Sequence, residues 1–443
     1  MEPEKRTRKV VVIGGGFAGL ATVNAMKGAN VDITVIDKSN HHLFQPLLYQ
    51  VATAALSPGD IAAPIRAIFG KNKKIRVILG EVNKIDTEAK KLHLVNETEI
   101  AFDQLVIAPG AQYNYFGNEH WKEHAPSLKT ISDALKIRER ILLSLEQGEQ
   151  IEDEEKRRPY LTYVIIGGGP TGVETAGAIA EIAGISMRRN YRNIKEKDIK
   201  IYLVEAAPGI LNGFSDPLGE KGQKMLEKLG VKVLLNSPVA RIEKDEVFLK
   251  VGSIKAANII WAAGIKAPAL LKDLKAEKDN LGRIFVKQDL SVPGIPDVYV
   301  LGDSAHFEDE MGKPLPALAS VAKQQGHYLG KLLATESSVI NTQKPFRYLD
   351  KGSMATVGRA KAVAQFKGIK ASGFFAWILW CTVHILLLVG IRNRWRVFSE
   401  WIWNYFTFKR GVQLITDRTN CHNCAPNPAI KPRRAIHTLD NIG

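Results

Sequence analysis

Apolar runs that end in glycine occur twice along the chain. Val10 to Gly19 reads VVVIGGGFAG, and Val164 to Gly172 reads VIIGGGPTG. In each copy an uninterrupted apolar run, typical of a strand buried on both faces, enters a glycine turn and is followed by a stretch with helical periodicity. The repeat predicts two strand–turn–helix units of the same kind, and therefore an α/β fold with two similar domains.

Shorter periodic segments lie between and after the two copies. Ile75 to Gly110 contains short alternating runs with a turn at Asp86 to Lys90, which predicts a β-meander inserted in the first domain. Glu152 to Arg158, with the charge run EDEEKRR, is interpreted as a solvated loop. Strand-like sequence returns from Gly282 and ends in VYVLGD at Val298 to Asp303. We therefore divide the chain into residues 1–118 and 282–350 for the first domain, 119–281 for the second, and 351–443 for a C-terminal region.

The C-terminal region has a different character. Phe374 to Ile391 is an eighteen-residue stretch whose only strongly polar member is His384. As a helix it would be about 27 Å long, which lies between a tilted membrane-spanning helix and a helix in the membrane interface. Both alternatives stay open. The sequence after Gly411 predicts a weakly structured tail.

Positive charge is concentrated in the same region. The formal net charge is +15, and from Lys351 to the end fourteen Lys and Arg face three acids, a net +11. Five of the seven tryptophans also lie there, at Trp377, Trp380, Trp395, Trp401 and Trp403. Tryptophan mixed with basic side chains predicts attachment to a membrane surface with anionic lipids. Nucleic acid is disfavoured as a partner because a soluble nucleic-acid binder does not need so apolar a segment.

The N-terminus and the cysteines indicate in which cellular compartment the main body lies. Met1 to Lys9 is charged and leads into an apolar strand without a signal-peptide core, so we expect the main body to stay in the cytoplasm. No cysteine precedes Cys381, which excludes a disulfide-stapled extracellular fold and a redox-active cysteine pair in the body. Cys421 and Cys424 form a single C-x-x-C without a second pair at zinc spacing, and no metal site is predicted.

The first glycine turn has the spacing of a dinucleotide-binding turn. Gly14, Gly16 and Gly19 form G-x-G-x-x-G, which provides a tight turn, close approach of backbone to a pyrophosphate, and close helix packing. Asp37 closes the next strand, where it can accept hydrogen bonds from ribose hydroxyls. The alternative is a structural turn without a ligand. It is disfavoured because strand, helix and acid are all in place.

The second turn repeats this arrangement with Gly167, Gly169 and Gly172, and Glu205 ends the following strand. A carboxylate at that place favours free ribose hydroxyls and repels a 2′-phosphate, and no arginine follows it in the turn. We therefore expect NADH rather than NADPH. The alternative, a decayed structural copy, is disfavoured because every position that needs glycine has it.

Together these motifs resemble the two-dinucleotide-binding flavoprotein superfamily over most of residues 8–350. The resemblance implies two Rossmann-like domains, with FAD at the first turn and NADH at the second. Gly302 and Asp303 are similar to the superfamily's late GD signature, whose aspartate binds the flavin ribityl chain. Ala108 to Gly110 is similar to its ATG motif, except that Pro109 stands in place of threonine. The residues implied for FAD are Gly14, Gly16, Phe17, Ala18, Gly19, Asp37, Lys38, Gln45, Val82, Ala108, Gly110, Gly302, Asp303, Ala319 and Ser320. Those implied for NADH are Gly167, Gly169, Pro170, Thr171, Gly172, Glu205, Ala263 and Gly264.

Two further segments resemble one family within that superfamily, the type II NADH:quinone oxidoreductases. Asn40 to Ala54, NHHLFQPLLYQVATA, is similar to the segment that lines the flavin, and Pro316 to Gly326, PALASVAKQQG, to the quinone-site motif. The resemblance implies that Gln324 faces the quinone with Gln325 beside it, and Ser320 stands where many members carry glutamine. The alternative for this segment is a helix N-terminus with exposed amides. Glu174, in the first turns of the second helix, is either compensation of the helix dipole or, as the family implies, a carboxyl beside nicotinamide and flavin that orients the ring or handles a proton.

The resemblance implies a respiratory enzyme that passes a hydride from NADH to FAD and reduces a membrane quinone without pumping protons. We expect it to be a homodimer attached by its C-terminal region to the cytoplasmic face of a bacterial inner membrane. Three alternatives remain. A sulfide:quinone oxidoreductase is disfavoured by the lack of body cysteines, and a soluble NADH-dependent ferredoxin reductase has no use for an apolar basic tail. A membrane-bound flavin redox sensor would oxidise NADH slowly whatever quinone is added.

Overall fold

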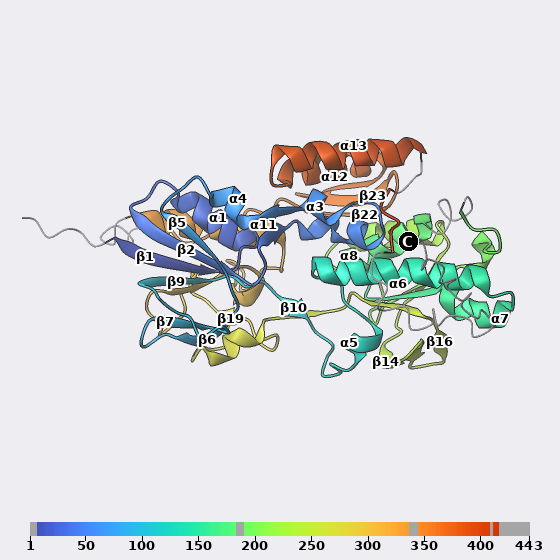
Figure 1. Ribbon diagram of the computed structural model, residues 1–443, viewed down its shortest axis with the longest axis horizontal. Coiled ribbons are helices and arrows are strands. Elements are labelled where there is room, and N and C mark those ends of the chain that lie inside the picture. The colour runs from blue at the N-terminus through green and yellow to red at the C-terminus, as the bar shows by residue number, and fades with distance from the viewer. Residues whose placement is uncertain (1–6, 183–189, 336–343, 408–410, 416–443) are drawn as a thin grey trace, which may run out of the picture.

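Two parallel sheets, one containing each glycine-turn strand, form the two large domains (Figure 1). The computed structural model describes residues 7–182, 190–335, 344–407 and 411–415. In each sheet the strand that enters the glycine turn lies between two parallel neighbours. The predicted α/β fold with two similar domains is therefore confirmed.

The first sheet has the strand order β20-β9-β1-β2-β5. One face packs on helices α1 and α11, and the opposite face packs on the predicted meander, β6-β7-β8. The strands are β1 Arg8–Ile13, β2 Val31–Asp37, β5 Ile75–Leu79, β9 Gln104–Ile107 and β20 Val298–Val300, with the meander at β6 Val82–Asp86, β7 Lys91–Leu94 and β8 Glu99–Ala101. The helices are α1 Phe17–Met26 and α11 Ala319–Ala334.

The second sheet, β13-β12-β11-β17, is built in the same way. Helices α6, α8 and α10 cover one face, and the meander β14-β15-β16 covers the other together with α5. The strands are β11 Thr162–Ile166, β12 Lys200–Val204, β13 Val231–Leu234 and β17 Asn258–Trp261, with the meander at β14 Val239–Glu243, β15 Glu246–Leu249 and β16 Ser253–Lys255. The helices are α5 Trp121–His124, α6 Ile131–Gln150, α8 Pro170–Glu181 and α10 Asp216–Glu227.

The chain crosses between the domains twice, at one place. It leaves the first domain through β10 (Gln112–Tyr113) and returns through β18 (Ile265–Lys266), and the two strands pair antiparallel. After the return come η5 Ala269–Asp273, β19 Ile284–Phe285, β20, η6 Gly302–Ser304, β21 Ala305–His306 and α11. The first domain therefore contains two separate stretches of sequence.

A series of short helices and strands follows β2 and leads from the first domain toward the C-terminal region. These elements are β3 His41–Leu43, η1 Gln45–Leu47, α2 Leu48–Ala52, α3 Pro58–Ile61, β4 Ala62–Pro64 and α4 Ile65–Phe69. Helix α2 packs against α6 and α8 of the second domain, and α3 packs against the last helix, α13. The segment therefore touches all three parts of the molecule.

The C-terminal region contains a small sheet that the sequence pattern did not predict. Strands β22 Ser353–Gly358, β23 Lys361–Phe366 and β24 Ile369–Gly373 form an antiparallel sheet, and β22 packs closely on α8. The apolar stretch Phe374 to Ile391 forms one helix, α12 Phe374–Leu387, and α13 Ile391–Thr407 begins at the last residue of the stretch, with Gly390 at φ +87° between the two helices. Within the described residues, no helix has the length and apolar character needed to cross a membrane. The predicted tail beyond residue 415 lies outside the described part of the chain.

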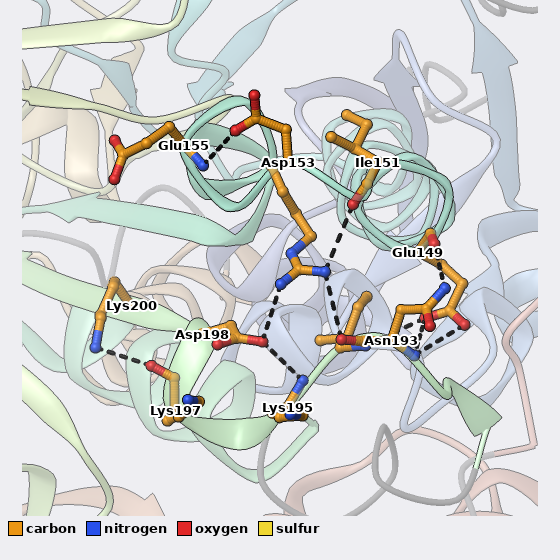
Figure 2. A network of polar contacts seen from close by, with 11 residues as sticks. Glu149, Ile151, Asp153, Glu155, Asn193, Lys195, Lys197, Asp198 and Lys200 are labelled. Carbon is orange, nitrogen blue, oxygen red and sulfur yellow. Dashed lines mark hydrogen bonds and ion pairs between the residues drawn. The ribbon is translucent and has the colours of Figure 1, made fainter.

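The interpretation of Glu152 to Arg158 as a solvated loop is wrong about the loop, although six of its seven residues are exposed. The segment forms helix α7 (Glu154–Arg157), whose N-cap Asp153 accepts hydrogen bonds from the N–H groups of Glu155 and Lys156. The Arg157 side chain is buried and pairs with Asp198 at 3.5 Å. Figure 2 shows Asp153 and Asp198 in the polar network that joins this end of the second domain to residues 193–200. One member of the charge run is thus a structural anchor.

Helices α1 and α11 approach each other closely because α11 carries glycine at the contact. A Cβ at Gly326 would lie under 3.0 Å from the carbonyl of Ala18, and one at Gly330 under 3.0 Å from the carbonyl of Thr22. Carbonyls inside a helix cannot move aside, so both positions need glycine. This packing holds the N-terminal end of α11 beside the first glycine turn.

We predict that Gly330→Ala lowers the stability of the protein by about 1–3 kcal/mol, because the methyl group forces the two helices apart. Thermal unfolding followed by circular dichroism measures the change. Gly59→Ala is the matched control, since Gly59 lies in helix α3 and an added methyl group there would meet no atom within 4 Å. Equal melting temperatures for the two variants would contradict the packing argument.

Candidate active site

The first glycine turn is crowded at two of its glycines and open at the third. A Cβ at Gly14, where φ is +99°, would lie under 3.0 Å from the Ala108 carbonyl, and one at Gly19 under 3.0 Å from the Gly14 carbonyl. A Cβ at Gly16, the N-cap of α1, would meet no protein atom within 4 Å. The protein itself requires the outer glycines. The open space at Gly16, before a helix N-terminus, fits the close approach of a pyrophosphate.

The second glycine turn reproduces the first in each respect. Gly167 has φ +113° and lies against the backbone of Ala262, and Gly172 lies against the carbonyl of Gly167. Gly169, the N-cap of α8, again has no protein atom within 4 Å of a Cβ position. The molecule thus has two cradles of the same shape, one at the start of α1 and one at the start of α8.

Each cradle is braced by the acidic residue predicted for it. Asp37 accepts a hydrogen bond from Gly15 N at 2.5 Å through one oxygen and from Ser39 N at 2.7 Å through the other. Glu205 accepts from Gly168 N at 2.5 Å and from Ala207 N at 2.8 Å in the same way. Burial raises the pKa of Asp37, and the two backbone N–H groups oppose that effect. Carboxylate oxygens have further lone pairs, which leaves capacity for ribose hydroxyls.

Several residues predicted for FAD lie at the carboxyl edge of the first sheet with Gly14. Ser304 Oγ donates to the Gly110 carbonyl at 2.6 Å, which joins the segment after β9 to the segment after β20. Gly302, with φ +65°, donates its N–H to Gln325 Oε1 at 2.7 Å. Asp303 lies between these two anchored residues. Val82 begins β6 and Gln45 begins η1.

The polar side chains of the predicted quinone motif already have protein partners. Gln325 is buried and holds Gly302, as just described. The side-chain amide of Gln324 makes two hydrogen bonds with the backbone of Leu349. Its nitrogen donates to Leu349 O at 2.9 Å, and its oxygen accepts from Leu349 N at 3.0 Å. Ser320 Oγ lies 3.0 Å from the hydroxyl of Tyr348. In this structure Gln324 and Ser320 therefore bind the segment that enters the C-terminal region.

Glu174 is a buried carboxyl at the contact of three parts of the molecule. It lies on α8 and accepts a hydrogen bond from Thr356 N of β22 at 3.4 Å. Burial raises the pKa of Glu174 to about 8, and the N–H groups of Thr356 and Trp380 lower it in part. At neutral pH the carboxyl is therefore largely protonated, and it can donate or accept a proton near physiological pH.

A cavity of about 130 Å³ lies beside Glu174, enclosed by α2, α8, β22, α12 and α13. Three of its lining residues, Glu174, Ala178 and Glu181, lie along one face of α8. Seven residues of helix cover about 10 Å, so this face leads from the buried acid to the half-exposed Glu181. Of the other lining residues, Tyr49 and Thr53 belong to the segment expected beside the flavin, and Trp377 and Trp401 were expected at the membrane. The sequence did not indicate Thr356, Arg359, Asn404 and Tyr405. In the sequence, only the spacing of Glu174, Ala178 and Glu181 along a predicted helix indicates that a cavity lies on this face of α8.

The two sheets, the paired cradles and their acids define a two-nucleotide flavoprotein oxidoreductase. A family model described as pyridine nucleotide-disulphide oxidoreductase matches residues 8–326, and one described as NDH2 C-terminal domain matches residues 351–410. The type II NADH:quinone oxidoreductase Ndh of Mycobacterium tuberculosis is 39% identical over 94% of this chain and 92% of its own length. NdhA of the same organism, also described as a type II NADH:quinone oxidoreductase, is 40% identical over 93% and 90%. This chain belongs to the type II NADH:quinone oxidoreductase family.

Solved structures agree with this assignment at the level of the fold. The structure of NDH2 from Plasmodium falciparum in complex with NADH has a TM-score of 0.84 at 21% identity and covers 93% of this chain and 100% of that one. A sulfide:quinone oxidoreductase from Aquifex aeolicus also shares the fold, with a TM-score of 0.70 at 17% identity, covering 90% and 96%. FAD and NADH are accordingly the cofactors of this chain.

We predict that stability falls as pH rises from 4.5, the ordinary pKa of a glutamate, toward about 8, the raised pKa of Glu174. In that interval the unfolded chain has released the proton and the folded chain still holds it, so unfolding is favoured by higher pH. Glu174→Gln stays neutral and removes this contribution. Urea unfolding of both proteins at pH 5.5 and pH 8.5 measures it.

The stability advantage of Glu174→Gln over the parent should be larger at pH 8.5. Glu220→Gln, at an exposed acid on α10, is the matched control and should show no such trend. A difference between Glu174→Gln and the parent that stays constant with pH would show that Glu174 is not a neutral buried acid.

Proposed function

We propose that this chain oxidises NADH through bound FAD and reduces a membrane quinone, with FAD in the cradle at Gly16 and NADH in the cradle at Gly169. The observation that carries the assignment is the open space at each middle glycine, where the protein has no packing reason for lacking a side chain. Asp37 and Glu205 supply the carboxylates for the two riboses. Glu205 is also the reason to expect NADH, because a 2′-phosphate beside it would be repelled.

When bound, FAD accepts a hydride and delivers the two electrons to a quinone. The contribution of this chain is to hold both nucleotides with their reactive ends in contact. The α1–α11 packing fixes the carboxyl edge of the first sheet, and the β10–β18 pair fixes the second domain against it. Orientation of this kind lowers the entropic part of the barrier, because the donor and the acceptor no longer have to find each other by diffusion.

Reduction of a quinone to a quinol also consumes two protons, and we propose that Glu174 handles one of them. Its raised pKa lets it hold a proton at neutral pH and release it to a stronger base. The cavity along Glu174, Ala178 and Glu181 gives space for water between the buried acid and the protein surface. Water near Gln324 is the second candidate donor. The two hydrogen bonds between Gln324 and Leu349 make Glu174 the stronger one.

A stopped-flow experiment tests the assignment of the two cradles. The purified yellow protein is reduced with NADH and then mixed with a short-chain quinone, and flavin absorbance reports each step. We expect Gly169→Val to keep its FAD but to lose reduction by NADH, because the side chain fills the second cradle. After reduction by dithionite, the same variant should still be reoxidised rapidly by quinone.

Gly16→Val is the counterpart and should lose FAD instead. Two outcomes would overturn the proposal. Reoxidation of the parent no faster with quinone than with air would favour a redox sensor, and loss of FAD from Gly169→Val would mean that the cradles are assigned the wrong way round.

We also propose that helix α13 attaches the protein to the membrane, because it is built with its apolar side outward. Ile391, Trp395, Phe398, Ile402 and Phe406 are exposed at intervals of three or four residues, which is one face of a helix. The side facing the protein contains the buried Val397 and three side chains that donate hydrogen bonds to the body: Trp401 to Gln50, Asn393 to Ala62 and Asn404 to Ala55. Figure 1 shows α13 along the outer edge of the molecule, above α12.

The chemistry of this face fits a bilayer surface. Its exposed aromatic rings include Phe375 on α12, which is 83% exposed, and Phe406 on α13, which is 74% exposed. Arg392 and Arg396 are also exposed on α13. Aromatic and basic side chains together bind the headgroup region of anionic lipids. We therefore place the protein on the cytoplasmic face of a bacterial membrane, where a lipid-soluble quinone is accessible. A second copy of this chain is the other occupant to test.

We predict that replacing Trp403 and Phe406 by serine weakens binding to vesicles by about tenfold or more, since each buried aromatic side chain contributes about 1.5–3 kcal/mol. Flotation with vesicles of phosphatidylcholine, with and without phosphatidylglycerol, measures binding and should show a preference for the anionic lipid. The control exchanges Val251 and Met311, which are at least as exposed and lie on the body, for serine. If the serine variant of α13 binds vesicles normally but changes from dimer to monomer in light scattering, the face is a subunit interface instead.

A further inference from the structure

Lys129 lies where the two large domains meet. Its ammonium nitrogen is 3.8 Å from Oδ2 of Asp303, and both side chains are mostly buried, with exposed fractions of 22% and 20%. Lys129 precedes α6 of the second domain, whereas Asp303 lies on η6 of the first. The pair therefore joins the domains at the sheet edge where the sequence resemblance puts the flavin ribityl chain.

The backbone under Lys129 is firmly held. Its N–H donates to Asp133 Oδ2 at 3.3 Å, and the same carboxylate closes the capping box of α6 with Thr130. The carbonyl of the preceding residue, Leu128, accepts a hydrogen bond from the Tyr113 hydroxyl of β10 at 3.2 Å. The lysine thus extends from a fixed base beside the point where the chain crosses between domains.

The backbone under Asp303 is held as firmly. Its neighbours Gly302 and Ser304 are bonded to Gln325 and to the Gly110 carbonyl, respectively. Two side chains of opposite charge on two rigid supports meet without a direct hydrogen bond, because 3.8 Å exceeds the usual N–H···O range. The distance is still short enough for electrostatic attraction.

The Lys129 ammonium has N–H groups that lack a hydrogen-bond acceptor among the described residues. Within the residues that the structure describes, it makes no hydrogen bond, although it has three N–H groups and is largely buried. A buried cation needs acceptors, since losing its water without replacing it costs free energy. A hydroxyl-rich, anionic ligand at Asp303 supplies such acceptors.

We propose that Lys129 is a positioning residue for FAD, supplied by the NADH-binding domain across the domain boundary. It acts through Asp303, whose carboxylate it orients, and it contributes positive charge beside the bound cofactor. The proposal rests on the proposed binding of FAD in the first cradle and on the contact with the ribityl chain that the sequence resemblance implies for Asp303. Two consequences follow: removal of the charge weakens FAD binding, and it makes the midpoint potential of the flavin more negative, since the two-electron-reduced flavin is largely anionic at neutral pH.

The test compares Lys129→Met and Lys129→Arg with the parent. Lys266→Met is the matched control, because Lys266 forms an ion pair with Glu119 at 2.6 Å beside the same domain connection and does not face Asp303. FAD affinity is measured by fluorescence titration of the apoprotein, the midpoint potential by equilibration with a redox dye, and the stability of each apoprotein by thermal unfolding.

We expect Lys129→Met to bind FAD about tenfold more weakly, the effect of losing one charge-assisted contact, and to shift the potential to more negative values. Lys129→Arg should restore most of both properties, and Lys266→Met should change neither. If Lys129→Met matches the parent in FAD affinity and potential, or matches Lys266→Met in both, the lysine only joins the domains and the inference is wrong. A parent protein that takes up no FAD at all would instead contradict the proposed function.

Discussion

The close contact of a helix with the turn that precedes it is the constraint on which the rest of this structure depends. At Gly19 and again at Gly172, the backbone of a helix lies directly against the carbonyl of the first glycine of the turn, at a separation that a side chain would prevent. The contact aims the N-terminus of the helix at the space beside the middle glycine. The chain builds it twice from different flanking residues, Phe17 in one copy and Pro170 in the other. Everything that binds a nucleotide here is positioned from these two contacts.

Features that depend on local sequence could be predicted, and features that depend on distant partners could not. The glycine turns, their strands and their acids follow from residues within about forty positions of each other, so motif spacing and periodicity were enough. Gln324 could be placed on its helix, but its partner Leu349 comes from a later segment whose path no pattern indicated. The solvated-loop interpretation of Glu152 to Arg158 was wrong for the same reason, since the partner of Arg157 is Asp198.

The C-terminal region was the least predictable part because its residues form two surfaces, an inner one that packs on the body and an outer one that is exposed. The strands β22–β24 contain glycine and lysine between short apolar runs, which resembles loop sequence until the strands are paired. The apolar stretch Phe374 to Ile391 was expected to be helical to its end, but the helix stops at Leu387, Gly390 permits a turn, and a second helix starts at Ile391. On the inner side Trp380 and Thr356 enclose Glu174, while on the outer side rings of α12 and α13 face solvent. The segment that carries the proposed lipid-binding surface therefore also contributes to the burial that raises the pKa of Glu174.

The proposed attachment to the membrane would connect this region to the chemistry of the site. Glu174 owes its raised pKa to burial, and part of that burial comes from α12 and α13, whose opposite face is the proposed lipid-binding surface. Any rearrangement of α12 and α13 that admits water beside Trp380 would lower the pKa of Glu174 toward its ordinary value. Lys129 is independent of that region, because its support is the capped start of α6 and the β10 crossing. The second domain thus presents a buried carboxyl that depends on the C-terminal region and, in Lys129, a side chain whose support does not. The proposed attachment to the membrane would therefore act on Glu174 and leave the support of Lys129 unchanged.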